Sequence, residues 1–349
     1  MDKIEFAKKP SGGDAWDVAI IGSGPAALTA AIYTTRGAAS TLILGGETWG
    51  GQLMLTTTVD NYPGFPDGIQ GPDLMNSMRQ QAERFGAEFV QKNVQQVNFD
   101  AEPKELIADG QKYLTKAVII ATGADTKWLG VPGEDKLRGR GVSSCAPCDA
   151  PFFKNKKVAI VGGGDAAMEE ALVLTKYASN VIIIHRRDEF KASEAMQQKV
   201  MHEHGEGKIK ILWSTEVVEL TGEQNLEKAK LKTSMESDHI EEIRKEMNEY
   251  GGTILEEKDG YLSWELPLEG LFVAIGHVPS TGVFQDKIEL DEKGYVQVHN
   301  HTRTSKENGI FVAGDVHDYN YRQAVTAAGY GCMAGMDALK FLDKQGPSW

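Results

Sequence analysis

Two cysteines separated by two residues, Cys145-Ala-Pro-Cys148, are the residues of this sequence best suited to chemistry. A C-x-x-C pair can close a small disulfide that opens and re-forms, and this spacing favours the attacking thiolate. Asp149 follows directly and adds a carboxyl group that can donate or accept a proton, and the apolar residues 151–153 predict that burial raises its pKa. The motif therefore predicts thiol–disulfide exchange, with Cys145, Cys148 and Asp149 as the candidate catalytic residues.

Half of a zinc site has the same cysteine spacing. A zinc site needs two more ligands at metal spacing, yet the only other cysteine is Cys332 and no pair of histidines is near in sequence. Cys332 has no cysteine partner and is expected to be a small core residue. We therefore favour redox chemistry and expect no metal.

Length and composition limit the classes of protein that fit. At 349 residues the chain suits two domains, and its 41% hydrophobic residues include no run of the ~20 that a membrane helix requires. Because residues 1–16 are polar, without an export signal, and a C-x-x-C in a reducing cytosol is more often catalytic, we expect a cytoplasmic protein. The net charge of -13 disfavours nucleic acid and anionic membranes as partners.

A glycine fingerprint near the start of the chain predicts a nucleotide site. A buried strand over residues 17–21 runs into Gly22-Ser-Gly-Pro-Ala-Ala27, which opens a helix to about residue 36. In this strand–turn–helix setting the glycines let the backbone approach a pyrophosphate, and the helix N-terminus supplies N–H groups. The next strand, residues 41–44, ends in Gly45-Gly46-Glu47, so the usual ribose-binding acid is absent or displaced to Glu47.

Three further segments are candidates for the same site. Two are turn-rich loops, Gly50-Gly-Gln-Leu53 and Asn61-Tyr-Pro-Gly64, and the third is Ala121-Thr-Gly123, where a buried strand over residues 117–120 ends. A strand-to-loop exit of this kind is typical of cofactor contact. These segments extend the predicted nucleotide site of the first 125 residues.

A second copy of the fingerprint predicts a second nucleotide. A strand over residues 157–161 leads into Gly162-Gly-Gly-Asp-Ala-Ala167 and a helix over residues 168–177. The following strand, residues 181–184, delivers His185-Arg-Arg187 to the place where an NAD-binding fold has its acid. Arginines there bind a 2′-phosphate that an acid would repel, which favours NADPH, and Lys191 adds a further positive charge.

The remaining segments divide between an insertion and a return to the first domain. Residues 235–260 are acid-rich and predict a surface insertion with a short helix near residues 241–250. An apolar strand over residues 271–276 ends in a glycine that suits a hinge. The strand ending in Gly314-Asp315 places a carboxylate where it can bond a flavin's ribityl hydroxyl, and Arg322-Gln-Ala324 opens a helix of small residues.

Together these motifs resemble the low-molecular-weight thioredoxin reductases over almost the whole chain. The segments that carry the resemblance are Gly22 to Ala27, Gly50 to Leu53, Ala121 to Gly123, Cys145 to Asp149, Gly162 to Asp165, His185 to Arg187, Ala274 to His277, Gly314 to Val316 and Tyr321 to Ala324. The resemblance implies an α/β fold of two Rossmann-like dinucleotide-binding domains. The NADPH domain, residues 126–274, is inserted into a discontinuous FAD domain formed by residues 1–125 and 275–349.

The resemblance also implies which residues hold each cofactor. Those expected at FAD are Gly22, Ser23, Gly24, Pro25, Ala26, Gly51, Gln52, Asn61, Ala121, Thr122, Gly123, Gly314, Asp315, Arg322, Gln323 and Ala324. Those expected at NADPH are Gly162, Gly163, Gly164, Asp165, Ala166, His185, Arg186, Arg187, Lys191, Ile275 and Gly276.

The implied activity is that of an NADPH-dependent thioredoxin-disulfide reductase. In the family the second cysteine faces the flavin, so Cys148 takes that role, Cys145 attacks the disulfide of thioredoxin, and Asp149 matches the family's acid. The nicotinamide and the disulfide must take turns at one flavin, which implies rotation of the second domain about residues 124–127 and 276–278. The family also implies a homodimer.

Departures from the family pattern leave alternatives open. Pro147 and Ala150 stand where threonine and glycine are usual, and Pro147 lacks a backbone N–H that would otherwise face the Cys145 sulfur. Lys191 replaces the commoner arginine, and the acidic insertion is longer than usual. The alternatives are a reductase of another dithiol protein, glutaredoxin-like or peroxide-reducing, a flavin-dependent dithiol oxidase, and a redox sensor. The second fingerprint argues against the last two.

Overall fold

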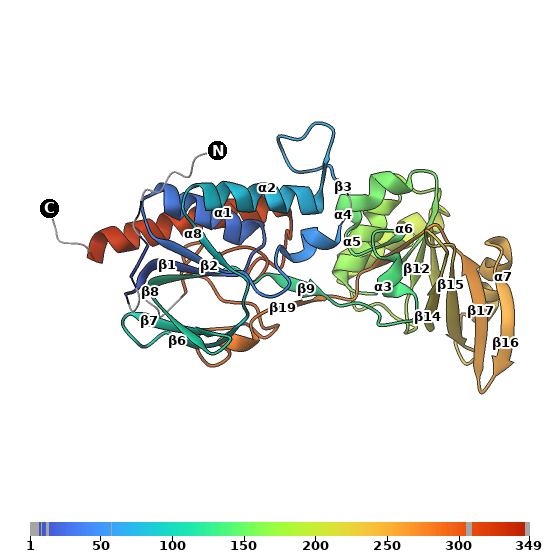
Figure 1. Ribbon diagram of the computed structural model, residues 1–349. Coiled ribbons are helices and arrows are strands. Elements are labelled where there is room, and N and C mark those ends of the chain that lie inside the picture. Colours follow the sequence, from blue (N-terminus) through green and yellow to red (C-terminus); the bar gives the residue numbers. More distant parts are fainter. Residues whose placement is uncertain (1–6, 8, 12–13, 57, 305–308, 346–349) are drawn as a thin grey trace. The chain divides into compact units, whose positions relative to one another are not determined.

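The computed structural model describes residues 7, 9–11, 14–56, 58–304 and 309–345, which form two compact units. Unit 1 comprises Met1–Asp125 and Val278–Trp349, and unit 2 comprises Thr126–His277 (Figure 1). The chain leaves unit 1 along strand β9 (Ala124–Thr126) and returns along β19 (His277–Pro279), and these two strands pair with each other.

Unit 1 is built on a seven-stranded sheet. Its strand order is β5-β2-β1-β8-β7-β6, and β20 also pairs with β8. The pairings among β5, β2, β1, β8 and β20 are parallel, whereas β6 and β7 form an antiparallel extension. The strands are β1 (Trp16–Ile21), β2 (Thr41–Leu44), β5 (Glu88–Val90), β6 (Val94–Asn98), β7 (Lys104–Ala108), β8 (Gln111–Ile120) and β20 (Ile310–Val312).

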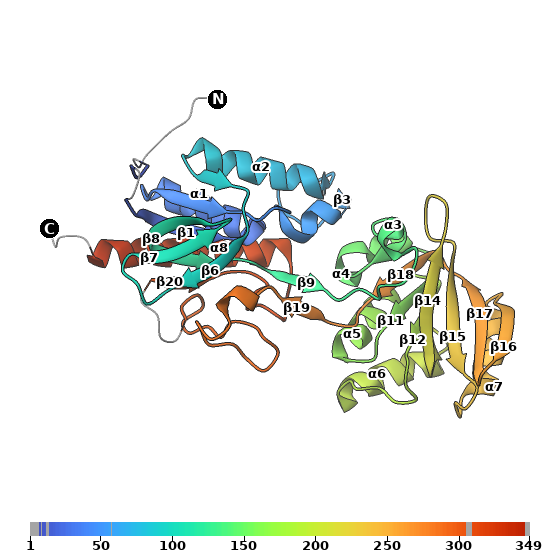
Figure 2. The same ribbon diagram turned by 60° about the horizontal axis from the view of Figure 1, so that its bottom comes forward.

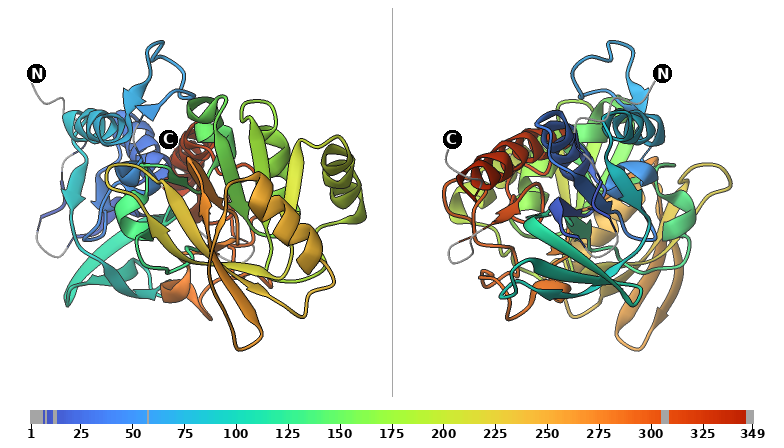
Figure 3. Two further views of the ribbon diagram at one scale, coloured as in Figure 1. Left: turned by 90° about the vertical axis from the view of Figure 1, so that its right-hand side faces the viewer. Right: turned by 60° about the vertical axis from the view of Figure 1, so that its left-hand side comes forward.

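Both faces of this sheet are covered, which explains why its central strands are almost continuously apolar. Three helices pack on one face, and α1 and α8 run side by side there, as Figures 1 and 3 show. On the opposite face, side chains of the parallel strands form a core with side chains of the β6–β7 extension and of residues 283–298. The helices are α1 (Pro25–Arg36), α2 (Gly71–Arg84) and α8 (Ala324–Gln345), and a small ribbon, β3 (Thr58–Val59) and β4 (Ile69–Gln70), precedes α2.

Unit 2 has a parallel sheet in the order β10-β18-β11-β12-β13. Helices α5 and α6 pack on one face and an antiparallel sheet, β14-β15-β17-β16, covers the other (Figure 2). The parallel strands are β10 (Val142–Ser143), β11 (Lys157–Val161), β12 (Asn180–Ile184), β13 (Ile209–Leu212) and β18 (Gly270–Val273). The antiparallel strands are β14 (Thr215–Thr221), β15 (Lys228–Ser234), β16 (Thr253–Lys258) and β17 (Tyr261–Pro267). The helices are α3 (Glu134–Leu137), α4 (Ala146–Asp149), α5 (Asp165–Leu174), α6 (Glu194–Gly205) and α7 (Ile240–Glu249).

The acid-rich segment 235–260 supplies α7 and the edge strand β16. Ile243 and Met247 of α7 are buried in the core of unit 2, whereas every residue of β16 is exposed. The segment is thus anchored by its helix and presents its strand to solvent. Within the described part of the chain, no helix is long and apolar enough to cross a membrane.

Candidate functional site

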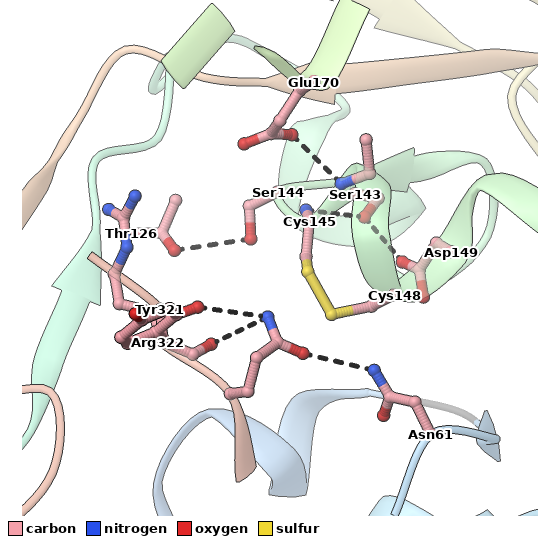
Figure 4. The surroundings of a disulfide bond; sticks show 12 residues. Asn61, Thr126, Ser143, Ser144, Cys145, Cys148, Asp149, Glu170, Tyr321 and Arg322 are labelled. Atoms are coloured by element: carbon pink, nitrogen blue, oxygen red, sulfur yellow. Dashed lines mark hydrogen bonds between the residues drawn. A yellow bond between two sulfur atoms is a disulfide. The ribbon is translucent and has the colours of Figure 1, made fainter. Parts of the chain in front are cut away.

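The two cysteines of the C-x-x-C motif form a disulfide, as the sequence predicts. The short strand β10 leads into Cys145, which is the N-cap of the one-turn helix α4, and Cys148 lies within that helix (Figure 4). A pair three residues apart on one helical turn brings both sulfur atoms to the same side. The fold therefore places a closed, exchangeable disulfide on unit 2.

Asp149 is held beside this disulfide by a serine that sequence reasoning missed. The Ser143 hydroxyl donates to Oδ2 of Asp149 at 2.5 Å and accepts the backbone N–H of Cys145 at 3.1 Å (Figure 4). Burial raises the pKa of Asp149 above its usual range, and the bond from Ser143 opposes that rise only in part. The carboxyl of Asp149 therefore holds a proton more readily than that of an exposed aspartate, and it lies beside the cysteines to which it could donate that proton.

A second residue missed by the sequence analysis bonds the same turn. Glu170 lies on α5, and its Oε2 accepts the backbone N–H of Ala146 at 3.0 Å (Figure 4). The only signal in sequence was its place on the helix that follows the second fingerprint. Its contact with α4 arises because α4 packs against α5.

In unit 1 the predicted glycine turn lies against the end of β8. Gly22 has a φ of +121°, and a β-carbon there would lie 2.1 Å from the carbonyl oxygen of Ala121, so this position requires glycine. A β-carbon on Gly24 would meet no atom within 4 Å, which leaves open space beside the turn. Pro25 and Ala26 then begin α1, so the helix N-terminus points its free N–H groups toward that space.

Other predicted residues converge on this turn from distant parts of the chain. A β-carbon on Gly314 would lie 2.9 Å from Cβ of Ala26, and one on Gly51 would lie 3.8 Å from Cα of Gly24. Ser23 bridges the turn to the loop after β2, because its hydroxyl donates to the Gly45 carbonyl at 2.6 Å. Five separate segments thus frame one site.

Polar side chains predicted for the site bond residues that are distant in the sequence. The Asn61 amide donates to Oε1 of Gln323 at 3.2 Å, although the two are 262 positions apart. The Gln52 amide donates to Oδ1 of Asp125 at 3.1 Å, and the Thr122 hydroxyl donates to the Ser280 carbonyl at 2.8 Å. Of the remaining predicted residues, Gly123 and Arg322 both have positive φ, and Ala324 begins α8.

Asp315 is the strongest sign of a bound group in unit 1. Its Oδ1 is buried and receives no hydrogen bond from the described residues. Burial, helped by the negative charge of Asp318, raises its pKa to about 7. A buried carboxylate without a donor is costly, and a ligand hydroxyl would supply the missing bond. The site therefore fits a dinucleotide with its phosphates at the Gly22 turn and a hydroxyl at Asp315.

Unit 2 repeats the turn with different surroundings. A β-carbon on Gly162 would lie 2.5 Å from the Ala274 carbonyl oxygen, whereas one on Gly164 would meet no atom within 4 Å. Gly163 is covered by the imidazole of His185, whose Cε1 would lie 2.2 Å from a β-carbon there. The second turn therefore also keeps open space at its third glycine, next to the start of α5 and Ala166.

The loop after β12 holds the predicted basic residues. His185 is buried, pairs through Nε2 with the Glu189 carbonyl at 2.9 Å, and so orders this loop from inside. Arg186, Arg187 and Lys191 are exposed, and the backbone N–H of Lys191 donates to the Gly163 carbonyl at 2.8 Å. Exposed guanidinium groups on the loop after β12 fit an anionic ligand.

Asp165, at the start of α5, has its carboxylate engaged elsewhere. Its Oδ1 accepts the backbone N–H of Ser193 at 2.9 Å and the Ser193 hydroxyl at 2.7 Å, which lowers its pKa. These bonds direct the negative charge toward the N-cap of α6. Ile275 and Gly276 follow β18 in the segment that leads back to unit 1, and the Gly276 carbonyl accepts the N–H of Lys127, which follows β9.

Comparisons with known proteins agree with this geometry. The model of the pyridine nucleotide-disulphide oxidoreductase family matches residues 16–331. The thioredoxin reductase of Streptomyces coelicolor is 46% identical over 331 residues, which cover 94% of both chains. The chain belongs to the thioredoxin reductases within this family.

Further relatives support the same assignment. The thioredoxin reductase of Rickettsia conorii is 43% identical over 328 residues, 94% of this chain and 98% of the relative. The crystal structure of the Streptococcus pyogenes thioredoxin reductase has a TM-score of 0.82 at 34% identity, covering 95% of this chain and 99% of that one. The Giardia duodenalis enzyme has a TM-score of 0.81 at 37% identity, over 94% and 99%.

These matches confirm the resemblance read from the motifs and the fold class of two Rossmann-like dinucleotide-binding domains. They also confirm an oxidoreductase of the thioredoxin reductase type, and membership of this family implies a flavin and a pyridine nucleotide. The residues proposed for each cofactor stay predictions.

Proposed function

We propose that this enzyme reduces the disulfide of thioredoxin with electrons from NADPH, through bound FAD and the Cys145–Cys148 disulfide. The observation that carries the proposal is that disulfide, which lies beside Asp149, a carboxyl whose pKa is raised by burial, on a unit that also contains a nucleotide-type turn. A nucleotide-binding fold alone would be compatible with many activities; the adjacent redox pair selects disulfide reduction.

The two cofactors would divide between the two units. FAD would take unit 1, with its pyrophosphate on the Gly22–Ala26 turn and a ribityl hydroxyl donating to Asp315. NADPH would take unit 2, with its pyrophosphate on the Gly162–Gly164 turn and its 2′-phosphate on Arg186 and Arg187. When bound, the flavin supplies a relay that accepts two electrons from the nicotinamide and passes them to a disulfide.

The chain's own thiols then carry out the exchange. The Cys145 thiolate attacks one sulfur of the partner's disulfide, so that a mixed disulfide forms and the partner's other sulfur leaves as a thiolate. Cys148 then attacks the Cys145 sulfur, which re-forms the enzyme disulfide and releases the partner's second thiol. Two electrons pass to the partner, and its two sulfur atoms each gain a proton.

Asp149 would hold and deliver a proton in this sequence. Because burial raises its pKa, it stays protonated to a higher pH than an exposed aspartate and can give its proton to a departing thiolate. Ser143 positions it, since one hydroxyl bonds both Asp149 and the backbone of Cys145.

We further propose that unit 2 turns as a rigid body about β9 and β19 during the cycle. The nicotinamide site and the disulfide both belong to unit 2, and both must reach a flavin held by unit 1. A disulfide engineered to lock the units together is expected to stop multiple turnover. Following the family, we also propose a homodimer in the cytoplasm, and light scattering of the purified protein tests the dimer.

The direct test is anaerobic NADPH oxidation by the purified flavoprotein with oxidised thioredoxin. Sustained turnover with the natural protein, lost in both Cys145→Ser and Cys148→Ser, is the expected result. Turnover with a glutaredoxin-like or peroxide-reducing protein but not with thioredoxin would keep the reductase and reassign its partner. In a parallel aerobic assay, turnover with oxygen alone that no dithiol protein increases would contradict the proposal.

A further inference from the structure

The first two backbone N–H groups of the redox turn are bonded to side-chain oxygens. The N–H of Cys145 donates to the Ser143 hydroxyl at 3.1 Å, and the N–H of Ala146 donates to the Glu170 carboxylate at 3.0 Å (Figure 4). One of these acceptors is neutral, whereas the other is an acid. Glu170 therefore places a carboxylate oxygen at Ala146, the first residue of α4, which directly follows Cys145 in the chain.

The remaining N–H groups of the turn are also absent or engaged. Pro147 has none, and the N–H groups of Cys148 and Asp149 both donate to the carbonyl oxygen of Cys145, at 3.2 Å and 3.1 Å. From residue 145 to residue 149, no backbone N–H is left without an acceptor in the oxidised form.

This arrangement removes the usual source of thiolate stabilisation. A cysteine at the N-cap of a helix gains from N–H groups at the second and third helical positions and from the positive end of the helix. Here the second position is Pro147 and the third is Cys148, whose N–H is engaged. A carboxylate at the same end repels a second negative charge, so the thiolate of Cys145 is disfavoured.

The charged groups around the turn are few. Asp149 comes from α4 itself and Glu170 from α5, while β10 and the turn Ala150–Phe153 contain no charged residue. On α5, Glu169 is exposed and Asp165 is bonded to Ser193. Glu170 is therefore the acid through which α5 acts on the turn.

We propose that Glu170 is a positioning residue that sets the redox balance of the Cys145–Cys148 pair. By taking the Ala146 N–H and adding a negative charge, it disfavours the ionised dithiol relative to the disulfide, which makes the dithiol a stronger electron donor. A thiol that ionises less readily is also more nucleophilic once ionised. The inference rests on the proposed function only for the identity of Cys145 as the attacking thiol.

The test compares Glu170→Gln and Glu170→Ala with Glu169→Gln, which removes the same charge from an exposed neighbour on the same helix. Each flavoprotein is equilibrated with mixtures of reduced and oxidised dithiothreitol without oxygen, and its thiols are trapped and counted by mass. Reduced dithiothreitol gives two electrons and two protons to the enzyme disulfide and closes to its own cyclic disulfide. The measured quantity is the equilibrium constant of this exchange.

Glu170→Gln is expected to shift the constant toward the enzyme dithiol by about three- to tenfold at alkaline pH. The shift should shrink below the pH at which Cys145 ionises, because only the thiolate feels the charge. Glu170→Ala is expected to shift it further, since it also frees the Ala146 N–H, and Glu169→Gln should leave it unchanged. In a Cys148→Ser background, alkylation of Cys145 should reach its midpoint at lower pH when Glu170 is replaced.

Equal constants for the natural protein and Glu170→Gln at every pH would overturn the inference, as would an equal shift in Glu169→Gln. A shift independent of pH would mean that the substitution acts through packing and not through charge. None of these measurements uses NADPH or thioredoxin. A protein inert toward thioredoxin that still shows the pH-dependent shift would thus refute the proposed function and leave this inference standing.

Discussion

The two glycine turns have the same backbone arrangement, but different residues follow the next strand in each unit. In unit 1, β2 is followed by Gly45 and Gly46, and the hydroxyl of Ser23 bonds the Gly45 carbonyl. In unit 2, β12 is followed by His185 to Arg187, with the imidazole covering Gly163 and both guanidinium groups exposed. Each turn still leaves open space at its third residue, Gly24 or Gly164.

We propose that this difference lets two copies of one fold hold two different dinucleotides. Recognition of the pyrophosphate uses backbone N–H groups and a helix N-terminus, which any sequence with the right glycines provides. In our proposal, a few side chains after the second strand add selectivity; they are basic in unit 2 and small in unit 1. Four substitutions test this division, and they are taken from the largest expected effect to the smallest.

Gly22→Ala should be the most damaging change, with Gly24→Ala as its matched control. At Gly22 the new β-carbon would clash with the Ala121 carbonyl at 2.1 Å, in a backbone conformation of φ +121° that alanine avoids. We expect loss of bound flavin and a fall of more than about 3 kcal/mol in the free energy of unfolding. Gly24→Ala has room and a φ of -73°, so it should weaken flavin binding while stability stays within about 0.5 kcal/mol. Flavin absorbance measures the bound flavin and urea unfolding measures the stability of each variant. Normal flavin content in Gly22→Ala would refute the expectation that this turn requires glycine to hold the flavin.

Replacing Arg186 and Arg187 together with alanine should affect unit 2 alone. The loss of two charge-assisted contacts to the 2′-phosphate is expected to raise KM for NADPH about 10- to 100-fold, with kcat and KM for NADH nearly unchanged. Lys199→Ala, an exposed charge on α6, serves as control. If the double variant lost NADPH and NADH activity equally, the loop after β12 would have a structural role instead of a selective one.

Asp315→Asn tests the acid of unit 1 through its dependence on pH. In the unfolded chain this carboxyl ionises near 3.8, whereas in the folded protein burial raises its pKa to about 7. Between these two pH values the carboxyl is still protonated in the folded protein but already ionised in the unfolded chain. The contribution of Asp315 to the stability of the folded protein therefore falls as pH rises from 3.8 to about 7, and then levels off. In flavin-free protein, Asp315→Asn should be the more stable form above pH 7 and lose that advantage near pH 4, while binding flavin about tenfold more weakly. Parallel stability curves for the two proteins across this range would contradict the assignment.

Ser193→Ala should have the smallest effect. It removes the hydroxyl that bonds Asp165 at 2.7 Å but keeps the backbone N–H at 2.9 Å, so the carboxylate is held less firmly away from the turn. We expect a two- to fivefold rise in KM for NADPH, because repulsion between the Asp165 carboxylate and the phosphates would cost roughly 0.5–1 kcal/mol. Flavin content should not change. Ser193→Thr, which keeps the hydroxyl, should restore the natural KM; failure to do so would show that the effect is steric.

Much of this architecture can be predicted from local sequence. The apolar strands before Gly22 and Gly162 and the small residues after them predict both turns, because a parallel strand, a glycine turn and a helix each leave a local pattern. The helix predicted near residues 241–250 is α7, Ile240–Glu249. Asp259 and Gly260 form the turn between β16 and β17 with φ of +53° and +81°, as an Asp-Gly pair in a hairpin favours.

Contacts between elements are what the local patterns do not contain. Glu170 meets Ala146 only because α4 packs on α5, and Asn61 meets Gln323 across 262 positions. Strand β16 escaped prediction since all its residues are exposed, so its sequence has no alternation of apolar and polar residues. The acid that positions the redox turn and the serine that orients Asp149 thus emerge only from the fold.

The central claim is that two nucleotide sites and one disulfide in this chain form a single path for electrons. An anaerobic titration of the flavoprotein with NADPH, followed by flavin absorbance, tests it most directly. The account predicts that the natural protein takes up two two-electron equivalents per chain, one for the flavin and one for the disulfide, and that the double variant Cys145→Ser/Cys148→Ser takes up one. Uptake of a single equivalent by both proteins would contradict the claim, because the disulfide would then lie outside the path.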